Sequence, residues 1–169
     1  MFLKLFSKKK RIPYGYIEYS KEDFESYFSI SEDIARQVEK DYISLVNQSD
    51  NKFTEFVNKS GRDLHSISNE LVKRYASNKS TAGQIALFYA NVSSSIGNQS
   101  KRSNLGITQC KWLGSACSVK SKDNSISHQS LDGKSYDCQK GILTPDGYVL
   151  PSVALGCLCS CRVILPGLE

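Results

Sequence analysis

The sequence contains no run of about 20 apolar residues, the length that a membrane-spanning helix requires. It also lacks the pattern of a secretory signal, because its short N-terminal apolar patch precedes the basic cluster instead of following it. Glycine fingerprints of the Walker and dinucleotide-binding types are absent as well. We therefore expect no transmembrane segment, and reducing conditions are the default expectation for the cysteines.

Acidic residues are absent from residues 1–11, which hold five basic residues. The chain has 22 basic residues in total, so 17 remain outside this segment against 17 acidic ones, and the net charge of +5 comes from the segment alone. A nucleic-acid-binding surface needs basic residues gathered on the folded body. We expect a basic, flexible tail over 1–11 and no specific nucleic-acid recognition by the body.

Three amphipathic stretches occupy the region 12–97. The stretch 31–47 begins with a serine and two acidic residues, a helix N-cap pattern, and continues with apolar residues at helical spacing. A second stretch covers 51–75, where Gly61 is expected to weaken or kink the helix. A third follows from Thr81 and is expected to stop at Gly97. The pattern predicts a helical bundle or stalk.

The composition changes near residue 100, where glycine, serine, aspartate and cysteine become frequent. Three segments resemble short strands: 106–112, 148–150 and 161–165. We expect the first to pair with the last, with Trp112 and Leu131 in the core and Gly133 turning the chain at positive φ. The predicted fold class is α+β, a helical N-terminal region followed by a small β-rich, cysteine-containing module over 98–169.

All six cysteines lie in this module, and a module of this size usually needs disulfides or a metal as a staple. Zinc takes about four sulfur or nitrogen ligands. Residues two apart in a strand point to the same side, so the segment 157–161 can present two or three sulfurs to one ion. The predicted zinc ligands are His128, Cys159 and Cys161, with Cys157 or Cys138 as the fourth.

Other interpretations of these side chains stay open. Cys117 or Asp123 could also complete a ligand set. No C-x₂-C pair is present, and the same residues fit reduced, partly buried thiols. Disulfides would need an oxidising setting, such as a mature extracellular virion.

The motifs of the last third follow a recognisable order. A glycine precedes a short strand ending in Trp112, and His128 stands three residues before a Leu-Asp-Gly-Lys turn. Gly147, Pro151 and a terminal Cys-x-Cys strand at 159–163 follow. This order resembles the C-terminal module of the phage Mu F-like head morphogenesis (minor head protein) family, over roughly residues 80–166.

The resemblance implies a non-catalytic minor head structural protein of a phage or prophage. Such a protein would assemble with portal or capsid proteins and could form a homo-oligomer. It would occur in the virion, and in the bacterial host cytoplasm during assembly. Two alternatives stay open. One is a small hydrolase or toxin that uses His128 with a cysteine. The other is a zinc-stapled adaptor that binds a host protein.

Overall fold

The computed structural model describes residues 12–167, so the predicted basic tail over 1–11 lies outside the described residues. The helices are α1 (Lys21–Phe28), α2 (Glu32–Val46), α3 (Lys52–Ser60), α4 (Leu64–Tyr75) and α5 (Lys79–Asn104). The strands are β1 (Gln109–Leu113), β2 (Ser135–Asp137), β3 (Ile142–Thr144), β4 (Gly147–Val149) and β5 (Ser160–Ile164), and the short 3₁₀-helix η1 (His128–Leu131) lies between β1 and β2. This order confirms the predicted α+β fold. Within 12–167, no helix combines the length and apolar character needed to cross a membrane.

The interruption expected at Gly61 is a complete break, and the end expected for the third helix was wrong. The stretch 51–75 forms two helices, because Gly61 takes φ +59° and ends α3 before Asp63 caps α4. The third helix does not stop at Gly97 but continues to Asn104. One glycine inside a helix costs only about 1 kcal/mol relative to alanine, which the neighbouring turns outweigh. The helix ends instead just before Gly106, which takes φ +69°.

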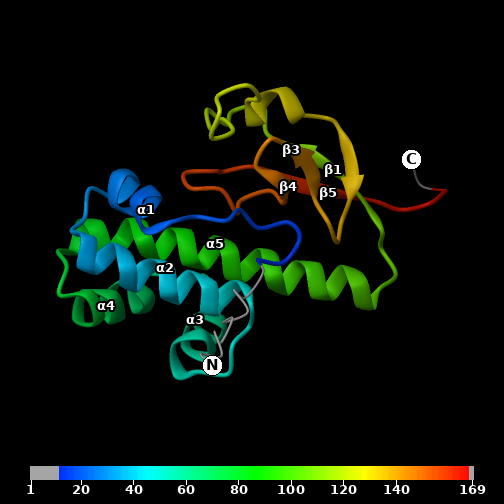
Figure 1. Cartoon of the computed structure of the whole chain (residues 1–169). Coiled ribbons are helices and arrows are strands. Elements are labelled where there is room, and N and C mark those ends of the chain that lie inside the picture. The colour runs from blue at the N-terminus through cyan, green and yellow to red at the C-terminus, as the bar shows by residue number, and fades with distance from the viewer. Residues whose placement is uncertain (1–11, 168–169) are drawn as a thin grey trace, which may run out of the picture.

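Helix α5 forms the centre of the molecule, with α2, α3 and α4 on one side and the β-rich module on the other (Figure 1). An aromatic cluster joins α1, α2 and α5 through tilted and edge-to-face ring contacts and one stacked pair, Phe24 with Phe28. Its members are Tyr19, Phe24, Phe28, Tyr42 and Phe88. Tilted and edge-to-face rings are the preferred arrangement of aromatic pairs, so this cluster fixes how the three helices pack.

A buried polar network ties α2 to α4 and α5. Arg74 donates two hydrogen bonds to Asp41, at 2.6 and 2.7 Å, and the Tyr75 hydroxyl donates a third at 2.6 Å. The Tyr75 and Tyr89 hydroxyls lie 2.9 Å apart. Burial raises the pKa of Tyr75, with the charge of Asp41 and the neighbouring Tyr89 adding to the effect. Both tyrosines therefore act as neutral hydrogen-bonding groups in this core.

The module contains an antiparallel sheet in the order β2-β1-β5 and a separate β3–β4 hairpin. Trp112 of β1 faces Cys161 of β5 in the register, which confirms the predicted pairing of the first and last strands. Trp112 and Leu131 are buried, as predicted. Gly133 takes φ +77° in the turn after η1, also as predicted.

Residues 12–20, the N-terminal segment, pass between the helices and the module (Figure 1). Gly15 forms a parallel bridge with Val149, and its carbonyl accepts a hydrogen bond from Leu150 N at 2.8 Å. The Tyr19 hydroxyl accepts one from Leu155 N at 3.0 Å. The first described residues thus connect the helical region to the last third of the chain.

Candidate metal centre

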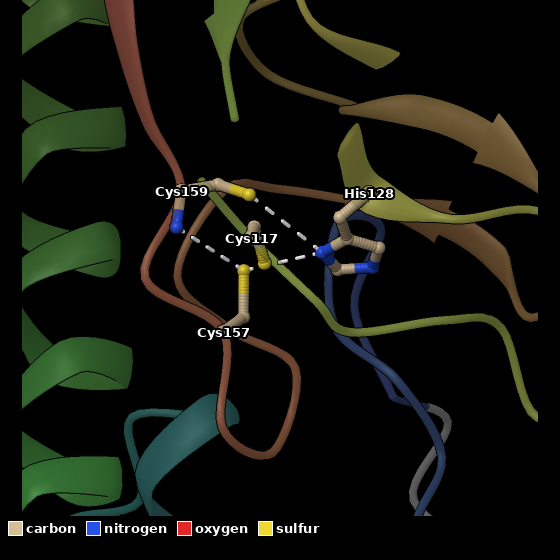
Figure 2. Close-up of side chains that lie close together, drawn as sticks. All are labelled: Cys117, His128, Cys157 and Cys159. Atoms are coloured by element: carbon tan, nitrogen blue, oxygen red, sulfur yellow. Dashed lines mark hydrogen bonds between the residues drawn. The ribbon is translucent and has the colours of Figure 1, made fainter. Parts of the chain in front are cut away.

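Four side chains that can ligate a metal meet inside the module: Cys117, His128, Cys157 and Cys159. Figure 2 shows their sulfur atoms and the imidazole pointing toward one another. Cys117 lies in the loop after β1, and His128 opens η1. Cys157 and Cys159 lie just before β5. Three separate parts of the module therefore converge on one point, which we call the Cys₃His group.

Local turns hold these ligands in place. Ser127 caps η1, its hydroxyl accepting a hydrogen bond from Ser130 N at 3.2 Å. His128 N donates to the carbonyl of Val119 at 2.8 Å. Cys157 N donates to Ala154 O at 3.0 Å, closing the turn that leads into β5. These hydrogen bonds hold the backbone at His128 and Cys157, two of the four ligand positions.

The spacing of the ligand atoms suits a four-coordinate ion. All four atoms lie within 4.8 Å of one another. His128 Nδ1 is 3.2 Å from Cys157 Sγ and 3.8 Å from Cys159 Sγ. A tetrahedral ion with bonds of about 2.3 Å to sulfur and 2.0 Å to nitrogen separates its ligand atoms by roughly 3.5–3.8 Å. The observed separations lie close to this range, so the group can hold a metal ion.

The Cys₃His group is closed to solvent. The exposed fractions are 6% for Cys117, 3% for His128, 1% for Cys157 and 2% for Cys159. Structural metal sites use four protein ligands in this way, whereas catalytic sites keep one position open for water or substrate. The arrangement has the character of a structural site.

Hydrogen bonds favour a thiolate at one of the sulfurs. The Cys159 thiol donates to Cys157, and this bond, opposed by burial and supported by His128, lowers the pKa of Cys157 to about 4. The backbone N–H of Cys159 also donates to Cys157 Sγ, at 3.4 Å. The same pairing raises the pKa of Cys159, because its proton is shared with the Cys157 thiolate. A thiolate is the form of cysteine that binds metals, so Cys157 is prepared for ligation.

Trp112 and Gly114 pack against the Cys₃His group. The Trp112 indole meets the His128 ring edge-on, with centroids 5.4 Å apart. Gly114 approaches so closely that a Cβ there would lie 2.9 Å from Cys159 Sγ. Gly114 N donates to Asp132 Oδ1 at 2.8 Å, which holds the loop after β1 against the turn that follows η1. The absence of a side chain at Gly114 is what allows this close packing.

Three of the predicted ligands, His128, Cys157 and Cys159, lie in the group, and two do not. Cys138 is bonded to Cys110, so its sulfur is not available as a thiolate ligand. Cys161 accepts a hydrogen bond from Arg102 at 2.8 Å and lies outside the group. The expectation of alternating sulfurs on one strand was wrong, because β5 begins at Ser160 and the first two sulfurs precede it.

The fourth ligand position is occupied by Cys117, which the sequence allowed but did not favour. The signal that points to it is Gly114, three residues earlier, because a glycine directly after a strand marks a turn back toward the body of the module. Asp123, the other residue considered, accepts hydrogen bonds from Ser121 and Ser125 instead. These bonds shape a turn, and Asp123 is not among the four clustered ligands.

The disulfide between Cys110 and Cys138 joins β1 to the residue after β2, and it leaves four free cysteines. The module therefore contains two separate kinds of cysteine chemistry, one cross-link and one group of convergent ligands.

No protein-family model matches the chain, and neither does any curated protein or solved structure.

Proposed function

We propose that this chain is a non-catalytic structural protein whose C-terminal module is stapled by zinc and serves as a minor head component of a phage or prophage. The observation that carries the zinc assignment is the closed Cys₃His group. Zn²⁺ prefers sulfur and imidazole nitrogen ligands such as these three cysteines and one histidine. Mg²⁺ and Ca²⁺ prefer oxygen ligands instead. When bound, the ion would supply folding free energy to a module with little regular structure.

The head-protein role rests on the ordered motifs that resemble the phage Mu F-like family. Two of the residues that carry this resemblance, His128 and Cys159, belong to the Cys₃His group. A structural ion at the meeting point of these motifs gives a physical reason for their order along the chain. In this role the chain would assemble with portal or capsid proteins in the host cytoplasm and remain in the virion.

Elemental analysis of the purified full chain, with a thiol count, tests the zinc assignment. We expect close to one zinc per chain and three thiols, those of Cys117, Cys157 and Cys159, that react only after a chelator and denaturant are added. A metal-free protein with four readily reactive thiols would overturn the assignment. Probing purified phage particles for this chain tests the head role separately. Its absence from particles, together with capture of a host protein, would favour the adaptor instead.

One observation favours a second candidate, a cysteine hydrolase. His128 Nδ1 lies 3.2 Å from Cys157 Sγ, the spacing of a nucleophile and its base, and Cys157 borders a hollow of about 380 Å³. Against it, no carboxylate among residues 12–167 accepts a hydrogen bond from His128, and Cys157 is 1% exposed. Alkylation of the protein as purified, without added metal, distinguishes the two. A Cys157 nucleophile would react quickly with iodoacetamide at neutral pH, whereas a zinc-bound, buried sulfur would resist.

A further inference from the structure

A second hollow, of about 210 Å³, lies between α5 and the chain that enters β5. The residues that α5 contributes to it include Asn91, Ser95, Asn98 and Arg102. Their spacing of four, three and four residues places them on one face of the helix. Along this face Asn91 is buried, Ser95 and Arg102 are half-buried and Asn98 is exposed, so the stripe lines a hollow that opens to solvent.

The charge of this hollow is entirely positive. Its lining contains two arginines, Arg62 and Arg102, and no aspartate or glutamate. Neither arginine forms an ion pair with a carboxylate of residues 12–167. The remaining polar groups are serine hydroxyls, asparagine amides and Cys161, whose sulfur accepts one hydrogen bond from Arg102 at 2.8 Å. The hydroxyls and amides can donate hydrogen bonds. Two guanidinium groups without a carboxylate partner beside these donors favour an anion.

Asn91 supplies a mostly buried amide to this hollow. The residue is 9% exposed, and its amide is not among the fully buried polar groups of residues 12–167 that lack a partner, so it reaches the open space of the hollow. An amide placed in this way can donate a hydrogen bond to a ligand. Asn91 lines both this hollow and the one beside Cys157, and only this hollow also contains arginines.

We propose that this hollow binds a phosphate-type oxyanion, held by Arg102 and Arg62 and by the amide of Asn91. The planar guanidinium group offers two parallel donors that match two oxygens of a phosphate. The volume suits a single phosphate group, either as the free ion or as the phosphate of a larger molecule. The proposal goes beyond the zinc-stapled module, because none of these three residues belongs to the Cys₃His group.

Binding of inorganic phosphate to the zinc-loaded full chain, followed by calorimetry and by amide NMR shifts along α5, tests this site. The variants Arg102→Gln and Asn91→Ala should each weaken binding by at least about tenfold, the loss expected for one hydrogen bond to a charged group. Lys101→Gln is the matched control, since Lys101 is exposed, adjacent on α5 and outside the lining. It removes the same charge and should leave phosphate binding almost unchanged.

A parallel titration with a short DNA oligonucleotide separates the two sources of the phosphate. Binding of the oligonucleotide alone, lost in Arg102→Gln but kept in Lys101→Gln, would support the site with a backbone phosphate as its ligand. Thermal unfolding adds a readout for variants of lowered stability, because phosphate should raise the melting temperature of the native chain but not of Arg102→Gln. Absence of binding by both ligands, or equal losses in Arg102→Gln and Lys101→Gln, would overturn the proposal.

Discussion

Replacing Gly114 by alanine should destabilise the module through a single methyl group. An added Cβ would lie 2.6 Å from Trp112 Nε1, 2.9 Å from Cys159 Sγ and 3.0 Å from the carbonyl oxygen of His128. Ordinary contacts begin at about 3.4 Å, so all three neighbours would have to move. Because Gly114 has no positive φ, steric overlap is the only penalty that alanine would bring.

The size of the effect follows from how little these neighbours can yield. Trp112 is fully buried, and the carbonyl of His128 is backbone. Overpacking of a tight core typically costs about 1–3 kcal/mol, and we expect the upper part of this range. Displacement of Cys159 Sγ should also weaken zinc binding by about 10–100-fold, the usual loss when the support of a ligand is disturbed.

Urea unfolding and chelator competition measure these two effects. Gly97→Ala is the control, since a Cβ there meets nothing within 4 Å and the residue lies inside α5. That change should raise the free energy of unfolding by about 0.5–1 kcal/mol, the difference in helix propensity. If Gly114→Ala matched the native chain in both stability and zinc affinity, the close packing described around Cys159 would be refuted.

Three further changes test other parts of the structure. Cys159→Ser should lower zinc affinity more than about 100-fold in a chelator titration, since it removes a ligand itself and not only its support; unchanged affinity would exclude Cys159 from the site. Arg74→Ala should lower the free energy of unfolding by about 2–3 kcal/mol, because it leaves the carboxylate of Asp41 without its partner. The loss is smaller than for a fully buried pair because the Arg74 side chain is 37% exposed, and a loss below about 1 kcal/mol would contradict the role given to Asp41. Replacing Cys110 and Cys138 together by serine opens a loop of 28 residues and should lower the free energy of unfolding by roughly 3 kcal/mol, measured with denaturant. If the native chain unfolded at the same denaturant midpoint with and without reductant, the cross-link would be contradicted.

Local signals were sufficient for much of the fold. The N-cap at Ser31 accepts a hydrogen bond from Ile34 N as the pattern indicated, and the first and last strands of the module pair as predicted. Helix α1 was not predicted, although Ser20 and Asp23 form a reciprocal capping box at its start. Its eight residues are too few for a clear helical period, and contacts of its aromatic side chains with α2 and α5 hold it in place.

The candidate site was predicted only in part. Residue types identified His128, Cys157 and Cys159, but the assignment of the remaining cysteines depends on distances that spacing does not encode. Cys138 and Cys110 are 28 residues apart and become neighbours only because β2 pairs with β1. Cys117 reaches the group only because the loop after β1 turns back at Gly114. Sheet register and loop path therefore decide which sulfurs meet.

The path of the N-terminal segment has a consequence for how the chain matures during translation. Tyr19 emerges early from the ribosome. Its hydroxyl accepts a hydrogen bond from the backbone amide of Leu155, which lies 136 residues later in the chain. Until Leu150 emerges, the carbonyl of Gly15 lacks its hydrogen-bond donor, and until Leu155 emerges the Tyr19 hydroxyl lacks its own. A nascent chain cut short before Leu155 would retain its helices with the aromatic cluster uncovered along one edge, a surface that chaperones and proteases recognise. The arrival of Leu150 and Leu155 therefore decides whether residues 15–19 are protected.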